Sequence, residues 1–325
     1  MCSQVSISIL VERGLCSSCG ACAAVCPFSA IEFPEPFSLP RVIGDKCRLC
    51  GLCYRICPQV GIVDEVRGRE VKPLATYMAR STLAEVRGVA QCGGVVTTLA
   101  MYLLDRRFVD AVVSVGRDEY WRPVPKLITD KLGVLEVAGS KYTYVSVLTL
   151  LRDVVRSDAI RSVAVIGLPC HMRAIEKMRR LKLAASQKVK YLISIFCMHN
   201  FEYGVVKYIV EKFGLDIKSI SKMDIKRRFI VKLVDGRVLE VPLKELDQFV
   251  RACCRSCPEF VSTIADVCVG SVGAEEGWST VFVMSERGRG IVEDAVRDQY
   301  LEVKELPEKA MKIVAKLISM KVGSR

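Results

Sequence analysis

The sequence predicts a mixed α+β and α/β fold, in which a small cysteine-rich N-terminal module precedes a larger α/β domain built on a mixed sheet. Nine of the sixteen cysteines lie within residues 1–62. Within residues 91–305, β-branched runs alternate with amphipathic stretches, the pattern of strands alternating with helices. Residues 63–90 are charged and free of cysteine, so we expect a linker with a short helix at 81–87.

The larger unit contains runs that are apolar enough to form buried strands. They are Val109–Val115, Val163–Ile166, Tyr191–Phe196 and Thr280–Met284. The helical patterns between them are Val95–Leu104, Val145–Val155, Met172–Leu181 and Val205–Phe213. Asp235 and Gly236 separate Phe229–Val234 from Val238–Val241, which predicts a hairpin that makes the sheet mixed.

The two ends of the chain carry simple patterns. Residues 1–10 alternate apolar and polar positions, which predicts a strand. Residues 306–325 predict an amphipathic helix with lysines on one face. Two interpretations of this helix stay open: its apolar face packs on the core, or its lysine face binds an acidic partner or anionic lipid.

Composition limits the class of protein. The chain has 325 residues, 51% of them apolar, and a formal net charge of +12. There is no signal-peptide pattern and no apolar run long enough to span a bilayer, so we expect cytoplasmic, reduced thiols. The basic residues are spread along the chain without a nucleic-acid-binding motif, which favours an anionic small ligand, an acidic subunit or an acidic membrane surface over nucleic acid.

The N-terminal module contains an internal repeat. A Cys-x2-Cys-x2-Cys-x3-Cys-Pro motif beginning at Cys16 recurs at Cys47, and Gly20 and Gly51 occupy the same place in each copy. In two-cluster ferredoxins the last cysteine of each motif ligates the other cluster. The expected ligand sets are therefore Cys16, Cys19, Cys22 and Cys57 for one [4Fe–4S] cluster, and Cys47, Cys50, Cys53 and Cys26 for the other. Zinc is the alternative, but this tandem spacing is unlike that of zinc ribbons.

The later cysteines form a second group. Cys254 and Cys257 make a Cys-x2-Cys pair, while Cys170 and Cys197 each follow a predicted strand. If those strands are neighbours, all four thiols could hold a third cluster; otherwise Cys170 and Cys197 are small buried apolar residues. We expect structural roles for the remaining single cysteines and packing roles for the two histidines. They are Cys2, Cys92, Cys268, His171 and His199.

Glycine-rich segments mark candidate ligand sites. Gly93 and Gly94 precede a helical pattern, where free N–H groups could hold a phosphate or where the pair could form only a turn and cap. Gly167 follows a predicted buried strand, a position at which open α/β sheets bind ligands. No nicotinamide-binding Gly-x-Gly-x-x-Gly motif follows a strand.

Taken in order, these motifs resemble the family of beta subunits of coenzyme F420 hydrogenases and dehydrogenases over nearly the whole chain. The segments that carry the resemblance are the two cluster motifs, Gly93–Thr97, Gly139–Tyr142, Gly167–Cys170, Phe196–Cys197, Cys254–Cys257, Gly270–Gly273 and Gly277–Trp278. The two complete ferredoxin motifs are most similar to the input subunits of reduced-F420 dehydrogenase complexes. The family often has Ser where this chain has Cys92, and Cys253 beside Cys254 leaves the ligand register open.

The resemblance implies cofactors and site residues. It implies FAD and a third [4Fe–4S] cluster held by Cys170, Cys197, Cys254 and Cys257. The implied cofactor-binding residues are Gly93, Gly94, Val95, Thr97, Ser140, Lys141, Gly167, Ser271, Gly273 and Trp278, of which Lys141 and Trp278 are the candidate catalytic residues.

The implied function is an FAD- and iron–sulfur-dependent oxidoreductase subunit. It would take hydride from reduced F420 and pass single electrons through its clusters to a larger redox subunit or a membrane-bound complex. Flavin is needed because the deazaflavin gives up hydride whereas a cluster accepts one electron. The alternatives are a related reductase, hydrogenase or formate dehydrogenase subunit working in the opposite direction, and a flavin-free electron-transfer subunit.

Overall fold

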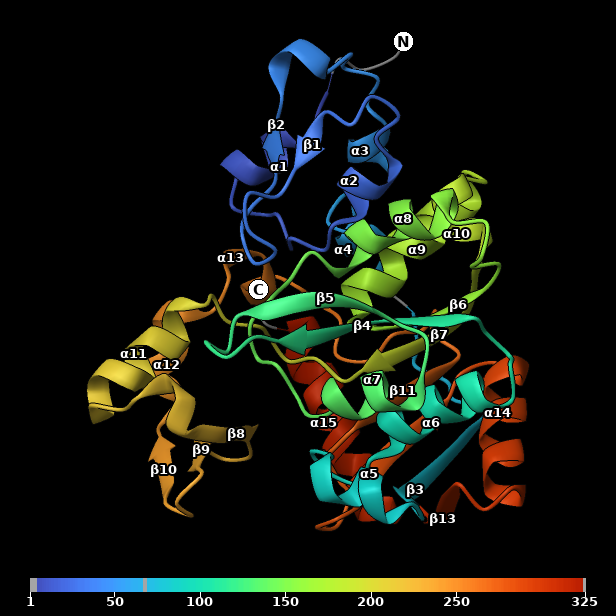
Figure 1. Cartoon of the computed structure of the whole chain (residues 1–325), viewed down its shortest axis with the longest axis vertical. Coiled ribbons are helices and arrows are strands. Elements are labelled where there is room, and N and C mark those ends of the chain that lie inside the picture. Colours follow the sequence, from blue (N-terminus) through green and yellow to red (C-terminus); the bar gives the residue numbers. More distant parts are fainter. Residues whose placement is uncertain (1–4, 67–68, 324–325) are drawn as a thin grey trace.

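The computed structural model describes residues 5–66 and 69–323. Its elements form a cysteine-rich N-terminal module, an eight-stranded sheet between two helical layers, and a smaller three-stranded sheet at one side (Figure 1). No helix in the described ranges is both long and apolar enough to cross a membrane. The mixed α/β architecture expected from the sequence is therefore confirmed.

The N-terminal module is built from short elements around its cysteine loops. These elements are α1 (Ser8–Glu12), α2 (Ala21–Val25), β1 (Ile31–Glu32), β2 (Arg41–Val42), η1 (Gly44–Lys46), α3 (Leu52–Arg55) and α4 (Ile62–Val66). Strands β1 and β2 pair antiparallel. Gly20 and Gly51 take positive φ angles at the N-caps of α2 and α3, so the two motif copies turn in the same way.

The main sheet has the strand order β13-β3-β12-β11-β7-β6-β4-β5. Its strands are β3 (Ala75–Ser81), β4 (Ala111–Arg117), β5 (Pro123–Ile128), β6 (Val163–Gly167), β7 (Val189–Ile195), β11 (Val267–Gly270), β12 (Ser279–Val283) and β13 (Leu301–Glu305). The neighbours β4, β6, β7 and β11 run parallel, and every residue of β6 is buried, as the continuous apolar run predicts.

Two helical layers cover the sheet, each with its own apolar cluster. One face packs against α8 (Leu150–Arg156), α9 (Pro169–Arg180), α10 (Ala184–Gln187) and α15 (Glu308–Gly323). The other packs against α5 (Ala84–Val89), α6 (Val95–Asp105), α7 (Lys131–Glu136) and α14 (Glu286–Arg297). The N-terminal module lies against the α8–α10 layer (Figure 1).

The small sheet has an apolar core of its own. It consists of β8 (Ile220–Ile225), β9 (Phe229–Leu233) and β10 (Val238–Val241), flanked by α11 (Gly204–Phe213), η3 (Ile217–Ser219), α12 (Leu243–Leu246) and η4 (Asp247–Phe249), and α13 (Ala252–Arg255) follows. Gly236 has a φ of +87° in the predicted hairpin turn. The hairpin is confirmed, but it belongs to this sheet, and the main sheet is mixed because β3, β5, β12 and β13 pair antiparallel.

Two local predictions are wrong. The N-terminal strand is replaced by α1, because Ile7 and Leu10 pack at helical spacing into the core of the module; residues 1–4 lie outside the described ranges. The expected linker at 63–90 contains β3, which pairs with β12 and β13 inside the sheet. The helix predicted at Val145–Val155 is confirmed as η2 (Val147–Thr149) followed by α8, and it begins at Val147 because the backbone before α8 bonds to the N-terminal module.

The C-terminal helix packs on the core, as one of the two interpretations expects. Ala310 and Val314 are buried, but Ile313 is 43% exposed. Lys321, expected among the exposed lysines, is buried and its ammonium donates to the carbonyl of Cys254. The buried face therefore runs along positions 310, 314, 317 and 321.

Candidate functional site

Two cavities in the N-terminal module are each lined by four cysteines. The first cavity is lined by Cys16, Cys19, Cys22 and Cys57. The second cavity is lined by Cys26, Cys47, Cys50 and Cys53. These are the two sets expected from the repeat, including the exchange of the last cysteine between motifs.

The first cavity disfavours free thiolates. Burial raises the pKa of Cys19 to about 11, and burial together with neighbouring thiols raises that of Cys22 well above its ordinary value. The backbone N–H of Ser18 donates to the sulfur of Cys16 at 3.3 Å. Thiols held in this way need a metal centre to displace their protons, which is the usual coupling of metal binding to thiol ionisation.

A third cysteine set lies where two central strands end. Because β6 and β7 are parallel neighbours, Cys170 and Cys197 leave the same edge of the sheet, as the sequence interpretation requires. Burial raises the pKa of Cys170, and the thiols of Cys19, Cys197, Cys257 and Cys254 raise it further. The third cysteine set (Cys170, Cys197, Cys254 and Cys257) is therefore a single neighbourhood that also adjoins the first cavity.

The surroundings of Cys253 and Cys254 indicate which of these adjacent cysteines belongs to the third cysteine set. Cys254 acts on the pKa of both Cys170 and Cys197. Cys253 is buried, and its sulfur lies 4.0 Å from that of Cys254. The contact with Cys253, together with the cations Lys321 and Arg251, lowers the pKa of Cys254 to about 6.

Among the described residues, no three His, Cys, Asp or Glu side chains are arranged around the position of one metal ion. A [4Fe–4S] cluster has a different requirement, because each of its four cysteines binds a different iron atom. Each of the two cysteine cavities supplies four thiols, and so does the third cysteine set. Four thiols are the donor set of one such cluster.

Close backbone contacts join the N-terminal module to the main domain. The N–H of Leu148 donates to the carbonyl of Cys19 at 2.9 Å. A Cβ added to Gly20 would lie 2.6 Å from the carbonyl oxygen of Ser146, so only glycine fits there without a shift. Arg251 donates to the carbonyl of Cys16 at 2.8 Å, which links the first cavity to the segment before Cys254.

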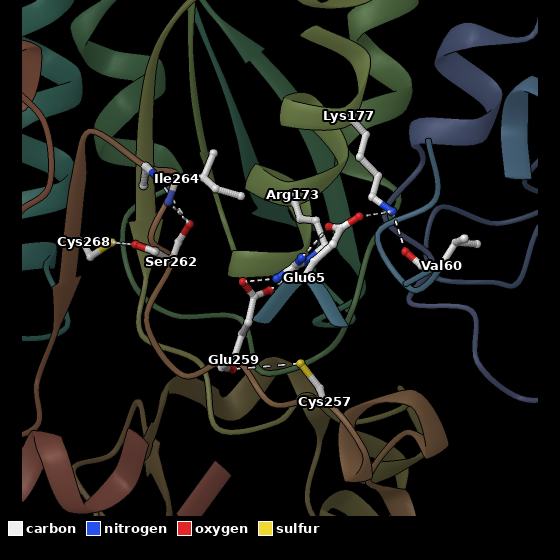
Figure 2. A network of polar contacts seen from close by, with 10 residues as sticks. Val60, Glu65, Arg173, Lys177, Cys257, Glu259, Ser262, Ile264 and Cys268 are labelled. Atoms are coloured by element: carbon white, nitrogen blue, oxygen red, sulfur yellow. Dashed lines mark hydrogen bonds and ion pairs between the residues drawn. The ribbon is translucent and has the colours of Figure 1, made fainter. Parts of the chain in front are cut away.

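A buried ionic network ties the same parts together (Figure 2). Arg173 of α9 pairs with Glu65 of α4 at 2.8 Å and with Glu259, which follows Cys257. Lys177 donates to the carbonyls of Cys57 and Val60 and pairs with Glu65 at 3.2 Å. The side chain of Arg173 is only 1% exposed, so the network is part of the protein interior.

The carboxyl edge of the main sheet, defined as the edge where β3, β11, β7, β6 and β4 end, collects the other motifs. Strand β3 ends beside Gly93, whose carbonyl accepts from Ser81, and β11 is followed by Ser271. In sheet order, the glycine-rich segments lie at β3, β12 and β11, and the cysteines lie at β7 and β6. The candidate flavin segments and the third cysteine set are therefore neighbours along one edge.

The start of α6 combines close packing with free backbone donors. A Cβ on Gly93 would lie 2.5 Å from the carbonyl oxygen of Ala79. The N–H of Gly93 already donates to the hydroxyl of Ser279. Gly94 has a φ of +74° at the N-cap, and no side chain caps this helix. The N–H groups after Gly94 are the ones available to an anion.

A polar group surrounds Cys92 beside this helix start. Burial and Asp224 raise the pKa of Cys92, whereas Lys222 and the hydroxyl of Ser271 oppose that rise. Tyr142 donates to Asp224 at 3.3 Å, and the same tyrosine lies near Cys92. This polar group joins the loop after β11, the 140–142 segment and β8 of the small sheet.

Gln91 offers a test of whether a polar cofactor fits here. Both polar atoms of its amide are buried, and neither has a hydrogen-bond partner among the described residues. A Cβ on Gly139 would lie 3.9 Å from Gln91 Oε1, so the amide faces the Gly139–Ser140 turn. Buried amides are normally satisfied, so an unpaired one beside free helix N–H groups fits a ligand with polar atoms, as a flavin nucleotide has.

Lys141 and Gly167, two of the expected cofactor-binding residues, make close contacts within the protein itself. The ammonium of Lys141 donates to the carbonyls of Val137, Ala138 and Gly139, which caps the end of α7. Burial and Arg117 lower its pKa to about 7. A Cβ on Gly167 would lie 2.5 Å from Nδ1 of His171, so this glycine makes room for the histidine.

Trp278 and Gly273 lie where the candidate site meets the core. Arg80 and Lys304 lie 4.5 and 4.1 Å from the centroid of the Trp278 ring, which is 8% exposed. Gly273 has a φ of +86°, and a Cβ there would lie 3.0 Å from Ala310 of α15. Val95 is buried in the core and Thr97 is 9% exposed on α6, so their side chains offer little surface to a ligand.

The two histidines and Cys268 behave as packing residues. Nδ1 of His171 accepts from the N–H of Leu168 at 3.1 Å, and burial lowers the His171 pKa to about 4. His199 packs edge-on against Phe201. Cys268 is fully buried, whereas Cys92 belongs to the polar group described above; Cys2 lies outside the described ranges.

Sequence reasoning missed several residues of this region. Lys222 and Asp224 come from β8, which no pattern predicted, and Lys222 also donates to the carbonyl of Ala90. Arg251 is 5% exposed and its guanidinium lies 3.6 Å from the ring centroid of Tyr144. Only Lys321 had a signal in the sequence, because it falls on the helical face of Ala310 and Val314.

Comparison with known proteins matches three family models. Residues 76–152 match the N-terminal model, and residues 160–309 the C-terminal model, of the coenzyme F420 hydrogenase/dehydrogenase beta subunit. Residues 15–63 match a 4Fe-4S dicluster domain. The iron–sulfur module expected from the cysteine repeat is therefore confirmed.

Individual relatives agree with these models. One subunit of the F(420)H(2) dehydrogenase of Methanosarcina mazei is 32% identical, with 97% of this chain and 91% of that protein aligned. The beta subunit of the coenzyme F420 hydrogenase of Methanothermobacter thermautotrophicus is 36% identical over 72% of this chain and 87% of its own. Coenzyme F420-dependent sulfite reductase of Methanocaldococcus jannaschii is 32% identical over 87% of this chain, which spans only 46% of that protein.

A solved structure supports the same relationship. A chain of the F420-reducing [NiFe] hydrogenase complex from Methanosarcina barkeri superposes with a TM-score of 0.74 at 32% identity, covering 78% of this chain and 90% of that one. The two family models, the relatives and this fold agree with the resemblance carried by the sequence motifs. The chain belongs to the family of coenzyme F420 hydrogenase/dehydrogenase beta subunits.

Proposed function

We propose that this chain is an FAD- and iron–sulfur-dependent oxidoreductase subunit that oxidises reduced coenzyme F420 and delivers single electrons to a larger redox partner. The observation that carries the proposal is the line of sites from the carboxyl edge to the N-terminal module. The polar group around Cys92 lies along the same sheet edge as the third cysteine set, whose Cys170 adjoins Cys19 of the first cavity. Cys53 of the second cavity in turn acts on the pKa of Cys22 in the first.

In this proposal each four-cysteine set holds one [4Fe–4S] cluster. The first and second cavities would use the two ferredoxin sets, and the third cluster would use Cys170, Cys197, Cys254 and Cys257. Cys254 is preferred to Cys253 because its thiol acts on both Cys170 and Cys197. Four cysteines on each cluster would leave no open coordination position, which suits electron transfer rather than substrate chemistry.

Flavin binding would use the residues at the start of α6 and their neighbours. The N–H groups after Gly94, the amide of Gln91 and the hydroxyls of Ser140 and Ser271 provide polar contacts. A bound flavin supplies the conversion between hydride transfer and one-electron transfer. The packing of Gly93 and Trp278 behind this region would fix the position of the helix start.

The same region favours an anionic coenzyme. Lys222 and Lys226 both act on the pKa of Cys92, so two cations from the small sheet border the polar group. F420 carries negative charge on its phosphate and glutamate tail, and the chain has a net charge of +12. Relatives in the family include hydrogenase and dehydrogenase subunits, which supports a larger redox subunit as the electron acceptor.

Steady-state assays of the anaerobically reconstituted protein test this function. With FAD bound, the protein should oxidise reduced F420 with a viologen dye as acceptor, and NADPH should be a far poorer donor. Removal of flavin should abolish F420 oxidation while dithionite still reduces the clusters. The KM for F420 should rise with ionic strength, since salt screens the cations. Efficient NADPH oxidation without a response to F420 would contradict the substrate, and failure to bind flavin would favour a flavin-free electron-transfer subunit.

A further inference from the structure

The two cysteine cavities of the N-terminal module differ in their access to solvent. All four cysteines of the first cavity are buried, none more than 6% exposed. In the second cavity Cys50 is exposed, and Cys26 and Cys47 are half-buried. The second cavity is thus the redox site of the module nearest the protein surface, at the opposite end of the line from the carboxyl edge.

The equivalent loop of the first motif is covered by the main domain, and its contacts can be compared with the second loop. The loop of the first motif docks on the main domain through the contacts of Cys19 and Gly20 with the backbone of residues 146–149. Its two intervening residues, Ser17 and Ser18, are small and polar, and Ser18 is buried. The first loop is therefore an intramolecular docking loop that brings its cavity against the main domain.

The second loop has the same backbone but different side chains. Leu49 and Ser18 occupy equivalent positions with φ angles of +49° and +50°. Leu49 is 46% exposed, and Phe28, which lines the same cavity, is 44% exposed. Arg48, in the place of Ser17, is exposed on the cavity rim. The second loop, unlike the first, therefore exposes two apolar side chains and one cation to solvent.

The second loop carries an excess of positive charge. In the segment from residue 41 to residue 50, Arg41, Lys46 and Arg48 are exposed against one acidic residue, Asp45, and Arg41 faces the exposed Glu32 across β1 and β2. A basic rim around an apolar centre attracts a partner with an acidic rim of its own. Because the loop also lines a cluster cavity, a partner seated on it would have its redox centre close to that cluster.

We propose that the exposed second loop, with Arg48, Leu49 and Phe28, docks a one-electron carrier protein with an acidic surface, and that electrons cross here between the second cavity and that protein. The proposal rests on the cluster assigned to the second cavity in the proposed function, and not on the flavin or F420. In the step, one electron leaves the reduced cluster and reduces the oxidised carrier; no bond is made or broken and no proton is required.

Stopped-flow electron transfer to a defined acceptor tests the surface. The full-length reconstituted chain is reduced with dithionite, freed of the excess, and mixed with an oxidised acidic [2Fe–2S] ferredoxin. R48E should slow the second-order rate roughly tenfold at low ionic strength, and the difference should disappear at high salt. Lys244→Glu, an exposed charge reversal on α12, should change the rate less than twofold.

A second variant separates docking from cluster assembly. Leu49→Ser copies the first loop, so it should retain the iron content and still slow the reaction severalfold at every salt concentration. Wild-type rates in both R48E and Leu49→Ser, or equal slowing by R48E and Lys244→Glu, would overturn the proposal. Dithionite supplies the electrons, so the test can be carried out even if the protein does not oxidise F420. Absence of a reducible cluster in the second cavity would contradict both this proposal and the proposed function.

Discussion

Lys321 was expected among the exposed lysines of the C-terminal helix, but its side chain lies beside the third cysteine set. Its ammonium is buried, donates to the carbonyl of Cys254 at 3.0 Å, and acts on the pKa of Cys197 and Cys257. A buried cation next to a cluster favours the more negative, reduced state of that cluster, because the local dielectric screens charge poorly. Lys321 is therefore suited to raise the reduction potential of a cluster held by the third cysteine set.

Replacing Lys321 by Met should lower that potential. We expect a shift of about 59 mV, a tenfold change in the one-electron equilibrium constant, in an anaerobic redox titration followed by EPR. Lys316→Met is the matched control, since Lys316 is exposed on the same helix. Equal potentials in wild type and Lys321→Met would show that the ammonium acts only through packing.

The two adjacent cysteines of α13 make a second residue-scale prediction. Cys254→Ser should remove about four irons per chain from reconstituted protein, because one lost thiolate destabilises the whole cluster. Cys253→Ser should keep the wild-type iron content, since the sulfur of Cys253 only packs against that of Cys254, at 4.0 Å. Twelve irons are expected for the wild type, three times four, against eight if the third set is empty. Iron loss in Cys253→Ser with retention in Cys254→Ser would reverse the register.

Helix α9 connects the two halves of the proposed electron path. It begins next to Cys170, and one turn further Arg173 joins Glu65 of the N-terminal module to Glu259 beside the Cys254–Cys257 segment. Breaking a buried ion pair by removing one partner leaves an uncompensated charge, which is costly. The network therefore fixes the distance between the first cavity and the third cysteine set.

Arg173→Leu should destabilise the protein by roughly 3–5 kcal/mol, measured as a fall in the thermal unfolding temperature under anaerobic conditions. Arg180→Leu removes an exposed arginine from the same helix, and its loss should change stability by less than about 1 kcal/mol. Electron transfer from the third cluster to the first should also slow in Arg173→Leu. Unchanged stability in both variants would mean that the network contributes no net free energy.

Local patterns predicted the elements that depend on local forces. The cysteine repeat predicts both cavities because three ligands of each set lie in one short loop and the other copy of the motif supplies the fourth. The buried strands and the helix at Val95–Asp105 follow from apolar periodicity. Strand β3 was missed because its segment has no alternating pattern and contains Arg80, which pairs with Glu302 of β13.

The third cysteine set and the polar group depend on contacts between distant segments. The set could be inferred only on the condition that β6 and β7 are neighbours, which sequence periodicity does not reveal. Lys222 and Asp224 reach Cys92 from the small sheet, more than a hundred residues away in the chain. Lys141 matched a motif, but the three carbonyls around its ammonium are set by the end of α7.

At the scale of the whole molecule, the sites form one ordered path. The carboxyl edge holds the candidate flavin residues and the third cysteine set, the first cavity is buried against the main domain, and the second cavity opens at the surface. Figure 1 shows the N-terminal module extending away from the sheet on the side of α8 and α9. An oxidoreductase subunit with this arrangement would separate coenzyme oxidation from delivery of electrons to its partner.

A single-turnover experiment follows the electrons from reduced F420 to the clusters. Reconstituted protein with FAD is mixed anaerobically with reduced F420 in the absence of any acceptor, frozen at successive times and examined by EPR. We expect oxidation of F420 together with the appearance of reduced [4Fe–4S] signals, and no such signals with NADPH. Clusters that stay oxidised in the presence of reduced F420, yet are reduced by dithionite, would contradict the proposed electron path.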